Sequence, residues 1–228
     1  MKHFQRIVET LKLDINLNRS TGQSLAKLAQ SAHLLTFDRD AYVFRAGDAS
    51  DHVHLVDSGK VILSREAESG RAFTSLIAVR GMPLNAVTCF MAKPKSFSAR
   101  VLERATVVAI PSPLFRQWVL AQPAVTEGIL ETMGNLLDSS YTRILDLIDQ
   151  SAAIRILNAL SMLSGRIGTP LPLTNTDVAE MTGVSRETAA RVISHLHKHG
   201  LISKSRGVIK ILDKVQLRKL STGPLFML

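Results

Sequence analysis

The spacing of apolar residues changes twice along the chain, and each spacing predicts a different kind of structure. Between residues 4 and 30, apolar positions recur at roughly helical intervals, which predicts one or two short helices. From about Leu35 to Pro111, short β-rich runs alternate with breaks rich in Gly, Asp and Ser, a pattern typical of a β-barrel, roll or sandwich. The expected strands cover residues 41–45, 53–56, 60–65, 74–79, 98–102 and 106–110, and the expected turns contain Gly47, Gly59, Gly70 and Gly81.

After Pro123 the pattern becomes that of one long helix, expected over residues 123–149. Positions on one stripe recur at steps of three and four, close to a heptad repeat, for about seven turns. Such a stripe can pack on the helix's own β domain or against the same helix of a second chain. Because it is longer than a β domain of this size could cover, we expect a homodimer. Its interface would consist of Ile129, Met133, Leu136, Leu137, Ser140, Ile144 and Leu147.

A polar interruption at residues 149–151 separates the long helix from the last part of the chain. Either Asp149 or Ser151 can cap a new helix over residues 152–163, so we interpret the interruption as a hinge. The sequence thus predicts an α+β protein with three parts: a β domain with N-terminal helices over residues 1–122, the dimerisation helix over 123–149, and a C-terminal domain over 150–228.

The C-terminal domain contains a helix-turn-helix pattern. Thr174 can cap the helix over residues 177–181, with Asp177 completing a capping box. Gly183 allows a tight turn, Ser185 caps a second helix that runs to about His199, and Gly200 ends it. Residues 201–211 then predict a β-hairpin, the wing of a winged helix.

The second helix has an apolar stripe on one side and charged residues on the other. Arg186, Glu187 and Arg191 project from its N-terminal end, which is the end that enters a major groove. Arg matches the two acceptors of guanine, and Glu can accept from the cytosine amino group. We expect phosphate contacts from Thr174, Ser185, Thr188, Lys204, Ser205 and Arg206. An exposed charged helix surface without a partner would explain the charges, but not their position just after the turn.

The charge distribution agrees with this interpretation. Residues 151–228 hold 11 Lys and Arg against 4 Asp and Glu, whereas the first 150 residues hold 17 against 15. A basic domain attracts phosphate backbones. The single cysteine, Cys89, excludes an internal disulfide and a four-cysteine cluster within one chain, and it fits a reducing cytoplasm. The N-terminus lacks the apolar run of a signal peptide, and no apolar stretch is long enough to cross a membrane, so we expect a cytoplasmic protein.

Several residues between 174 and 212 carry a resemblance to a known family: Thr174, Asp177, Val178, Ala179, Gly183, the run Ser185-Arg186-Glu187-Thr188, Arg191, and the run Gly200-Leu201-Ile202. This segment closely resembles the C-terminal domain of the CRP/FNR superfamily of bacterial transcription regulators. Residues 44–48 and 56–61 are similar to the glycine turns of that family's β-roll, and residues 107–111 to the strand before its dimerisation helix. The resemblance implies a β-roll (double-stranded jelly-roll-like) sensor domain followed by a winged helix-turn-helix.

The resemblance also implies how such a protein would work. Arg186, Glu187 and Arg191 occupy the family's three base-reading positions, which implies a TGTGA-like half-site in an inverted repeat, with half-sites roughly 34 Å apart. A homodimeric regulator of this kind, for instance an activator, would have double-stranded DNA and RNA polymerase as partners. A small-molecule effector would re-aim the two reading helices through the long helix and the hinge at residues 149–151.

The identity of the effector stays open. Relatives that bind cyclic AMP use a Glu and an Arg at positions that align with Ala86 and Phe97, so we expect no cyclic AMP binding of the usual kind. The single cysteine excludes the iron–sulfur cluster of the oxygen-sensing branch. Haem is possible through His52, His54, Met82 or Cys89, although the ligand positions of the carbon-monoxide-sensing branch are lost. The apolar replacements favour an uncharged or hydrophobic ligand in a pocket formed by Ala86, Phe97, Ser98, Asn135, Asp138 and Ser139.

Two alternatives to a DNA-binding regulator remain. The first is a ligand- or haem-binding regulatory module that acts through a protein partner. The second is an enzyme, but the sequence contains no convincing pair of nucleophile and base, phosphate-cradling loop or metal-ligand spacing, so we expect neither catalysis nor a metal site. His195 and His199 share a helix face compatible with metal, yet their place at a helix C-terminus favours a role as cations or phosphate contacts.

Overall fold

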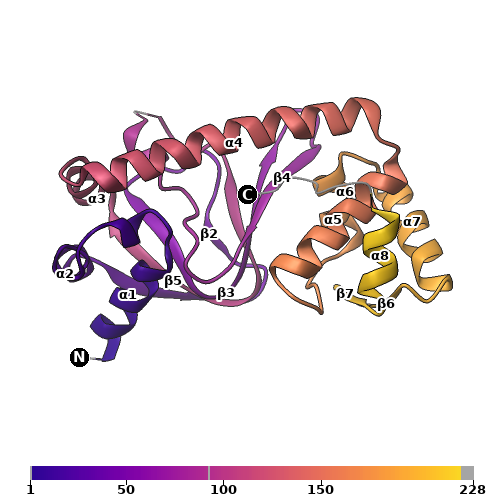
Figure 1. Ribbon diagram of the computed structural model, residues 1–228, viewed down its shortest axis with the longest axis horizontal. Helices are drawn as coiled ribbons and strands as arrows, with labels where there is room; N and C mark the ends of the chain where they lie inside the picture. The colour runs from indigo at the N-terminus through magenta and orange to yellow at the C-terminus, as the bar shows by residue number, and fades with distance from the viewer. Residues whose placement is uncertain (1, 92, 222–228) are drawn as a thin grey trace. The chain divides into compact units, whose positions relative to one another are not determined.

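A computed structural model describes residues 2–91 and 93–221 (Figure 1). The chain forms two compact units: Met1–Arg65 with Leu76–Leu136, and Glu66–Ser75 with Leu137–Leu228. The boundary therefore falls inside the long helix and inside one β-hairpin. Among the described residues, no helix is long and apolar enough to cross a membrane.

Up to residue 149 the chain forms α1 (Lys2–Leu13), the 3-10 turn η1 (Leu17–Arg19), α2 (Gly22–Gln30), β1 (His33–Phe37), β2 (Tyr42–Phe44), β3 (His52–Glu66), β4 (Ala72–Ala78), η2 (Thr88–Phe90), β5 (Ser98–Pro111), α3 (Ser112–Leu120) and α4 (Pro123–Asp149). The sheet has the strand order β1-β5-β3-β4, with β2 also paired to β5. The central strand β5 runs antiparallel to both β1 and β3, and Val108 lies opposite both Leu34 and Leu55.

The strands are longer than the sequence predicts. The expected strands 53–56 and 60–65 are one strand, β3, and those at 98–102 and 106–110 are one strand, β5. The turn expected at Gly59 is instead an irregularity within β3, where the register against β5 shifts. Gly59 has φ +82°, and a Cβ there would lie 2.5 Å from the carbonyl oxygen of Arg104, so the bulge needs glycine. Strand β1 was not expected.

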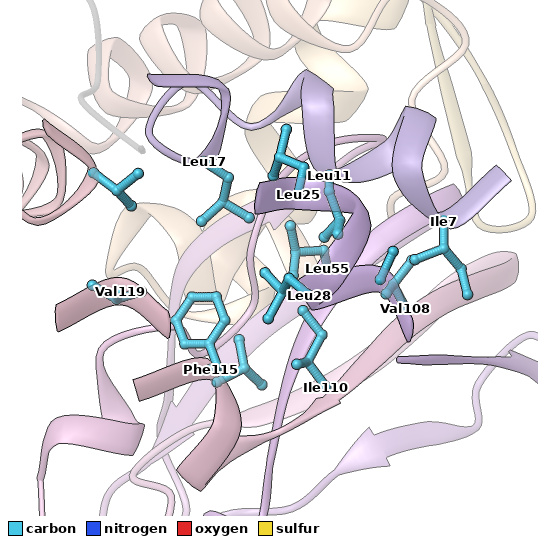
Figure 2. Packing of buried hydrophobic residues seen from close by; sticks show 13 residues of the cluster. Ile7, Leu11, Leu17, Leu25, Leu28, Leu55, Val108, Ile110, Phe115 and Val119 are labelled. Carbon is cyan, nitrogen blue, oxygen red and sulfur yellow. The ribbon is translucent and has the colours of Figure 1, made fainter. Parts of the chain in front are cut away.

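The three short helices cover one end of the sheet. Leu11 of α1, Leu25 of α2 and Phe115 of α3 are buried in one apolar cluster with Leu55 and Val108 of the sheet (Figure 2). Arg6 and Thr10 bind the buried carboxylate of Asp57 and so tie α1 to β3. A second apolar cluster forms where β2, β3 and β5 curve toward each other, and it contains Phe44, Val61, Leu63, Ala99 and Val101.

The long helix α4 has the range expected from the sequence. Its first half is anchored within the first unit, because the Asn16 amide donates to the Thr132 hydroxyl over 2.9 Å and Arg19 pairs with Glu131 at 2.6 Å. Many of its apolar side chains are exposed in the single chain: Leu130, Met133, Leu136, Leu137, Tyr141, Ile144, Leu145, Leu147 and Ile148.

The second unit contains α5 (Ala152–Arg166), α6 (Asn175–Thr182), α7 (Arg186–Lys198), β6 (Ile202–Ser205), β7 (Val208–Ile211) and α8 (Lys214–Leu220). Ser151, one of the two expected caps, accepts the backbone N–H of Ile154 and begins α5. Helices α5, α6, α7 and α8 bury a common core, to which Leu160, Met181, Ile193 and Leu217 belong. The hairpin β6–β7 is the expected wing, with Ser205 opposite Val208 at its end.

Candidate nucleic-acid interface

The first helix of the helix-turn-helix begins at a complete capping box, as predicted. The Thr174 hydroxyl accepts the Asp177 N–H over 3.2 Å, and the Asp177 carboxylate accepts the Thr174 N–H over 2.7 Å. Helix α6 is longer than expected, since it runs from Asn175 to Thr182. Two backbone donors that a helix start leaves unpaired are thus satisfied by one side-chain pair.

The turn has the predicted chemistry as well. Gly183 takes φ +64°, and the N–H of Val184 returns to the Ala179 carbonyl over 3.1 Å. Ser185 then caps α7 by accepting the Thr188 N–H over 3.1 Å, and Gly200 follows the helix with φ +72°. The second helix therefore begins at the position that the motif requires.

The predicted base-reading residues lie on the exposed side of α7. Arg186, Glu187 and Arg191 are exposed, while Ala189 and Ile193 on the opposite side are buried. Hydrogen bonds from its own backbone N–H and from Ser185, with the nearby Arg186 charge, lower the pKa of Glu187. Glu187 is thus an ionised carboxylate, which can only accept hydrogen bonds.

A cleft of about 280 Å³ lies where the helix-turn-helix meets the wing. It is lined by residues from the start of α6, by Arg186 and by the wing residues Lys204, Ser205, Arg206 and Gly207. Within this unit, the fold brings together groups that the sequence assigned to phosphate and to bases. The cleft is basic, because Arg186, Lys204 and Arg206 are its charged side chains.

Of the four hydroxyl groups predicted to contact phosphate, the three in the helix-turn-helix differ in what they already bind. Thr174 donates to the Asp177 carboxylate over 2.6 Å, so its proton is used in the cap. Ser185 and Thr188 have their hydroxyl oxygens 3.2 Å apart at the start of α7. The two hydroxyl groups and the Glu187 carboxylate therefore already contact one another at the start of α7.

Arg155, which the sequence did not single out, contacts the turn of the helix-turn-helix from α5. Arg155 of α5 donates from Nε to the Thr182 carbonyl over 2.9 Å and from Nη1 to the Gln150 carbonyl over 2.9 Å. It also reaches the Leu147 carbonyl at 3.3 Å. One side chain therefore joins the end of α4, the hinge and the turn. Its contact with the turn joins residues 27 positions apart, so no local pattern in the sequence identifies it.

The histidines at the end of α7 serve the local structure. His199 Nδ1 lies 2.9 Å from the His195 carbonyl, and His197 Nδ1 lies 3.0 Å from the Ile202 carbonyl at the start of the wing. In the described ranges, no group of three or more metal-ligating side chains is close enough to hold a metal ion.

The residues expected to form an effector pocket are placed as follows. Ala86 packs on the apolar cluster of α1–α3, near Cys89, whereas Phe97 packs on the cluster of β2, β3 and β5. Ser98 accepts the Ala46 N–H over 2.9 Å. Asn135 and Asp138 are exposed on α4, where Ser139 is half-buried.

This donor set does not fit the usual recognition of a cyclic nucleotide. Neither Ala86 nor Phe97 can pair with a phosphate or a ribose hydroxyl. The nearest buried cation in the sequence is Lys95, whose ammonium group donates to the Ala49 carbonyl.

Other residues considered for sensing are also held by the fold. Burial lowers the pKa of His54 to about 4, and its Nδ1 lies 3.3 Å from the Asn85 side-chain oxygen. Burial raises the pKa of Cys89 to about 11. The histidine is therefore neutral and the cysteine protonated at neutral pH.

Comparison with known proteins gives matches to both domains. A model of the cyclic nucleotide-binding domain matches residues 34–122, and a model of the Crp-like helix-turn-helix domain matches residues 144–220. The CRP-like cAMP-activated global transcriptional regulator of Mycobacterium tuberculosis is 25% identical over 206 residues, covering 86% of this chain and 91% of the relative. The anaerobic regulatory protein of Bacillus subtilis is 25% identical over 175 residues, covering 73% and 74%.

Solved structures share the fold. FixK2 from Bradyrhizobium japonicum has a TM-score of 0.72 at 16% identity, covering 84% of this chain and 98% of its own. The c-di-GMP responsive regulator CLP from Xanthomonas campestris has a TM-score of 0.71 at 19% identity, covering 85% and 100%. The order of the two domains, the helix-turn-helix geometry and the regulators among the relatives agree: this chain belongs to the CRP/FNR family and is a DNA-binding transcription regulator.

Proposed function

We propose that the protein binds an inverted-repeat operator as a homodimer and that Arg186, Glu187 and Arg191 read the bases of each half-site. The observation that carries this proposal is the exposure of these three side chains at the N-terminal end of α7, next to the basic cleft of the wing. Arg186 and Arg191 supply forked donors for guanine, and the ionised Glu187 supplies an acceptor for cytosine. The half-site would be TGTGA-like.

The wing contributes affinity rather than sequence preference. Lys204 and Arg206 are exposed on β6 and at the hairpin turn, beside the cleft that also receives Arg186. Contacts to phosphate position a protein on the duplex and release counterions, which makes binding salt-dependent. The candidate neutral contacts are Thr174, Ser185, Thr188 and Ser205.

The exposed apolar side of α4 supports the homodimer. Ile144 is 52% exposed, an unfavourable state for an apolar side chain on a surface helix that a second copy would relieve. Met133, Leu136, Leu137, Ser140 and Leu147 are also exposed on this helix, whereas Ile129 packs against the apolar cluster of α1–α3. A dimer also supplies two reading helices, as an inverted repeat requires.

The β-roll would sense an effector other than cyclic AMP. Apolar side chains at Ala86 and Phe97, which pack on separate clusters of the first unit, favour an uncharged or hydrophobic molecule, with Ser98 as a candidate polar contact. Titration of the purified protein with cyclic AMP should give no binding heat. Saturable binding of cyclic AMP that improves operator affinity would overturn this part of the proposal. RNA polymerase would be the partner of the DNA-bound dimer.

A gel-shift experiment with two variants tests how the DNA is read. Glu187→Ala should bind the TGTGA-like duplex and a duplex with altered half-sites with more similar affinities than the wild type does. Lys204→Ala should weaken binding to all sequences evenly and reduce the slope of log K against log salt concentration by about 1. Equal losses on all duplexes for both variants would refute the assignment of base readers.

A further inference from the structure

Arg143, in the second half of α4, carries a buried positive charge. It is 6% exposed, and it makes no ion pair among the described residues. Its guanidinium group donates from Nη2 to the backbone carbonyl of Met181. The ring of Phe73 lies over the guanidinium carbon, with 4.0 Å between that carbon and the ring centroid. A guanidinium group is thus held between an aromatic face and a carbonyl oxygen.

The two contacts come from distant parts of the chain but belong to one compact unit. Phe73 lies on the hairpin segment Glu66–Ser75, which connects β3 to β4. Met181 lies in the last turn of α6, directly before the turn that sets the start of α7. Arg143 therefore connects the tip of a hairpin from the sheet to the helix-turn-helix.

Arg143, its helix neighbour Asp146 and the residue after Phe73 each have a buried polar atom that is unpaired among the described residues. The Nε of Arg143, one oxygen of Asp146 and the hydroxyl of Thr74 are buried without a hydrogen-bond partner. Residues three apart on a helix are neighbours, so Arg143 and Asp146 are within reach of one another. They nevertheless form no ion pair, although buried polar atoms are normally paired. In this position the carbonyl and the ring hold the guanidinium group, and the cation that acts on the Asp146 carboxyl is Arg155, which partly offsets the rise in its pKa caused by burial.

The turn that Arg143 contacts is held on two other sides. Arg155 donates to the Thr182 carbonyl, and Leu147 of α4 fills the space next to Gly183, where a Cβ would come within 2.8 Å of its Cδ2. The direction in which α7 leaves the turn thus depends on contacts from α4 and α5. Of these contacts, only the one from Arg143 also depends on the hairpin.

We propose that Arg143 is a positioning residue for DNA recognition. Phe73 keeps the Arg143 guanidinium group on the Met181 carbonyl, and this contact orients the turn and α7. Asp146 offers the guanidinium group a second position, in which the turn is released. This inference rests on the proposed base-reading role of α7. In the first position the reading helix is already oriented before it meets DNA. Less free energy is then needed to order it on binding. A movement of β3 and β4 that withdraws Phe73 favours the second position, so the sensor strands can control the turn.

Two single variants should shift this equilibrium in opposite directions. Phe73→Leu removes the aromatic face, so we expect amide exchange at residues 181–185 to become faster and affinity for an inverted TGTGA-like duplex to fall roughly tenfold. Asp146→Asn removes the competing carboxylate, so we expect slower exchange and equal or tighter binding. Phe4→Leu, at a phenylalanine of similar exposure on α1, is the matched control and should change neither.

Exchange measured by mass spectrometry on the DNA-free protein separates this inference from the proposed function. Arg186→Ala should lose DNA affinity with wild-type exchange at the turn. If Arg186→Ala keeps full affinity, the assignment of base readers fails while the exchange data still test the switch. Three results would overturn the proposal. The first is unchanged amide exchange in Phe73→Leu, and the second is tighter DNA binding by that variant. The third is a change of exchange in the same direction in Phe73→Leu and Asp146→Asn. If Phe73→Leu loses its cooperative melting transition, Asp146→Asn alone decides. Slower amide exchange at the turn in that variant supports the proposal, and faster exchange overturns it.

Discussion

His54 illustrates how the β domain uses a titratable side chain as part of its core. It lies on β3, its ring is 5.5 Å from that of Phe44, and Asn85 accepts its backbone N–H over 2.9 Å. Its residue type and its spacing from His52 had suggested a haem ligand. Burial and the Asn85 contact depend on residues distant in sequence, so spacing alone could not predict them.

Acid should destabilise the first unit through His54. Because the folded-state pKa is about 4, the unfolded chain binds a proton between pH 6.5 and 4 that the folded chain does not. The free energy of unfolding should therefore decrease by about 2 kcal/mol between pH 7 and pH 5. His54→Gln should lack that decrease. Urea titrations of both proteins at the two pH values measure the difference, and identical pH dependence would contradict the role given to His54.

The thiol of Cys89 should react slowly with alkylating reagents. Its Sγ donates to the Ala86 carbonyl over 3.1 Å, and its pKa of about 11 leaves roughly a hundredfold less thiolate than an ordinary cysteine has at neutral pH. Alkylation by iodoacetamide, followed by mass, should be correspondingly slower in the folded protein than in urea. Equal rates in both would show that burial does not protect the thiol.

At the scale of elements, local signals were predicted better than long-range ones. The capping box of Thr174, the turn at Gly183 and the wing depend on residues close in sequence, and the structure confirms them. Gly59 was wrongly interpreted as a chain reversal, because a bulge and a turn both favour a glycine with positive φ. Strand β1 and the arginine contacts to the turn depend on partners far along the chain, so no local pattern predicted them.

The turn of the helix-turn-helix should tolerate only glycine at position 183. Alanine there would have to adopt φ +64° and would crowd Leu147, so Gly183→Ala should lower the free energy of unfolding of the second unit by about 1–2 kcal/mol. Gly165→Ala, in α5 with open space around it, should instead raise the free energy by about 0.5 kcal/mol. Urea unfolding of both variants measures the two effects, and a neutral Gly183→Ala would contradict the turn geometry.

At the scale of the whole molecule, the account depends on two copies of α4 meeting along their apolar stripe. Ile144→Glu should shift the protein from twice its 25.0 kDa chain mass toward the single chain, because a carboxylate would be buried at the interface. Val215→Glu, at a more exposed apolar position on α8, should leave the mass unchanged. Sedimentation equilibrium measures both, and a wild-type mass for Ile144→Glu would place the interface elsewhere.

The order of domains, the helix-turn-helix and the choice of family followed from the sequence because they rest on motifs. The effector did not, since Ala86 and Phe97 differ from the charged residues that define the known signal in relatives, and the fold places them in separate apolar clusters. The assignment of the DNA-reading residues can therefore be tested more sharply than the identity of the effector.

Selection of bound duplexes from a random DNA library tests the central claim most directly. The purified protein should enrich an inverted repeat of TGTGA-like half-sites whose centres are roughly one helical turn apart, 34 Å. Arg186→Ala should lose the guanine preference in each half-site. The assignment of α7 as the reading helix of a homodimer would be contradicted if the wild-type protein enriched no sequence or only a single half-site. It would also be contradicted if Arg186→Ala enriched the same repeat as the wild type.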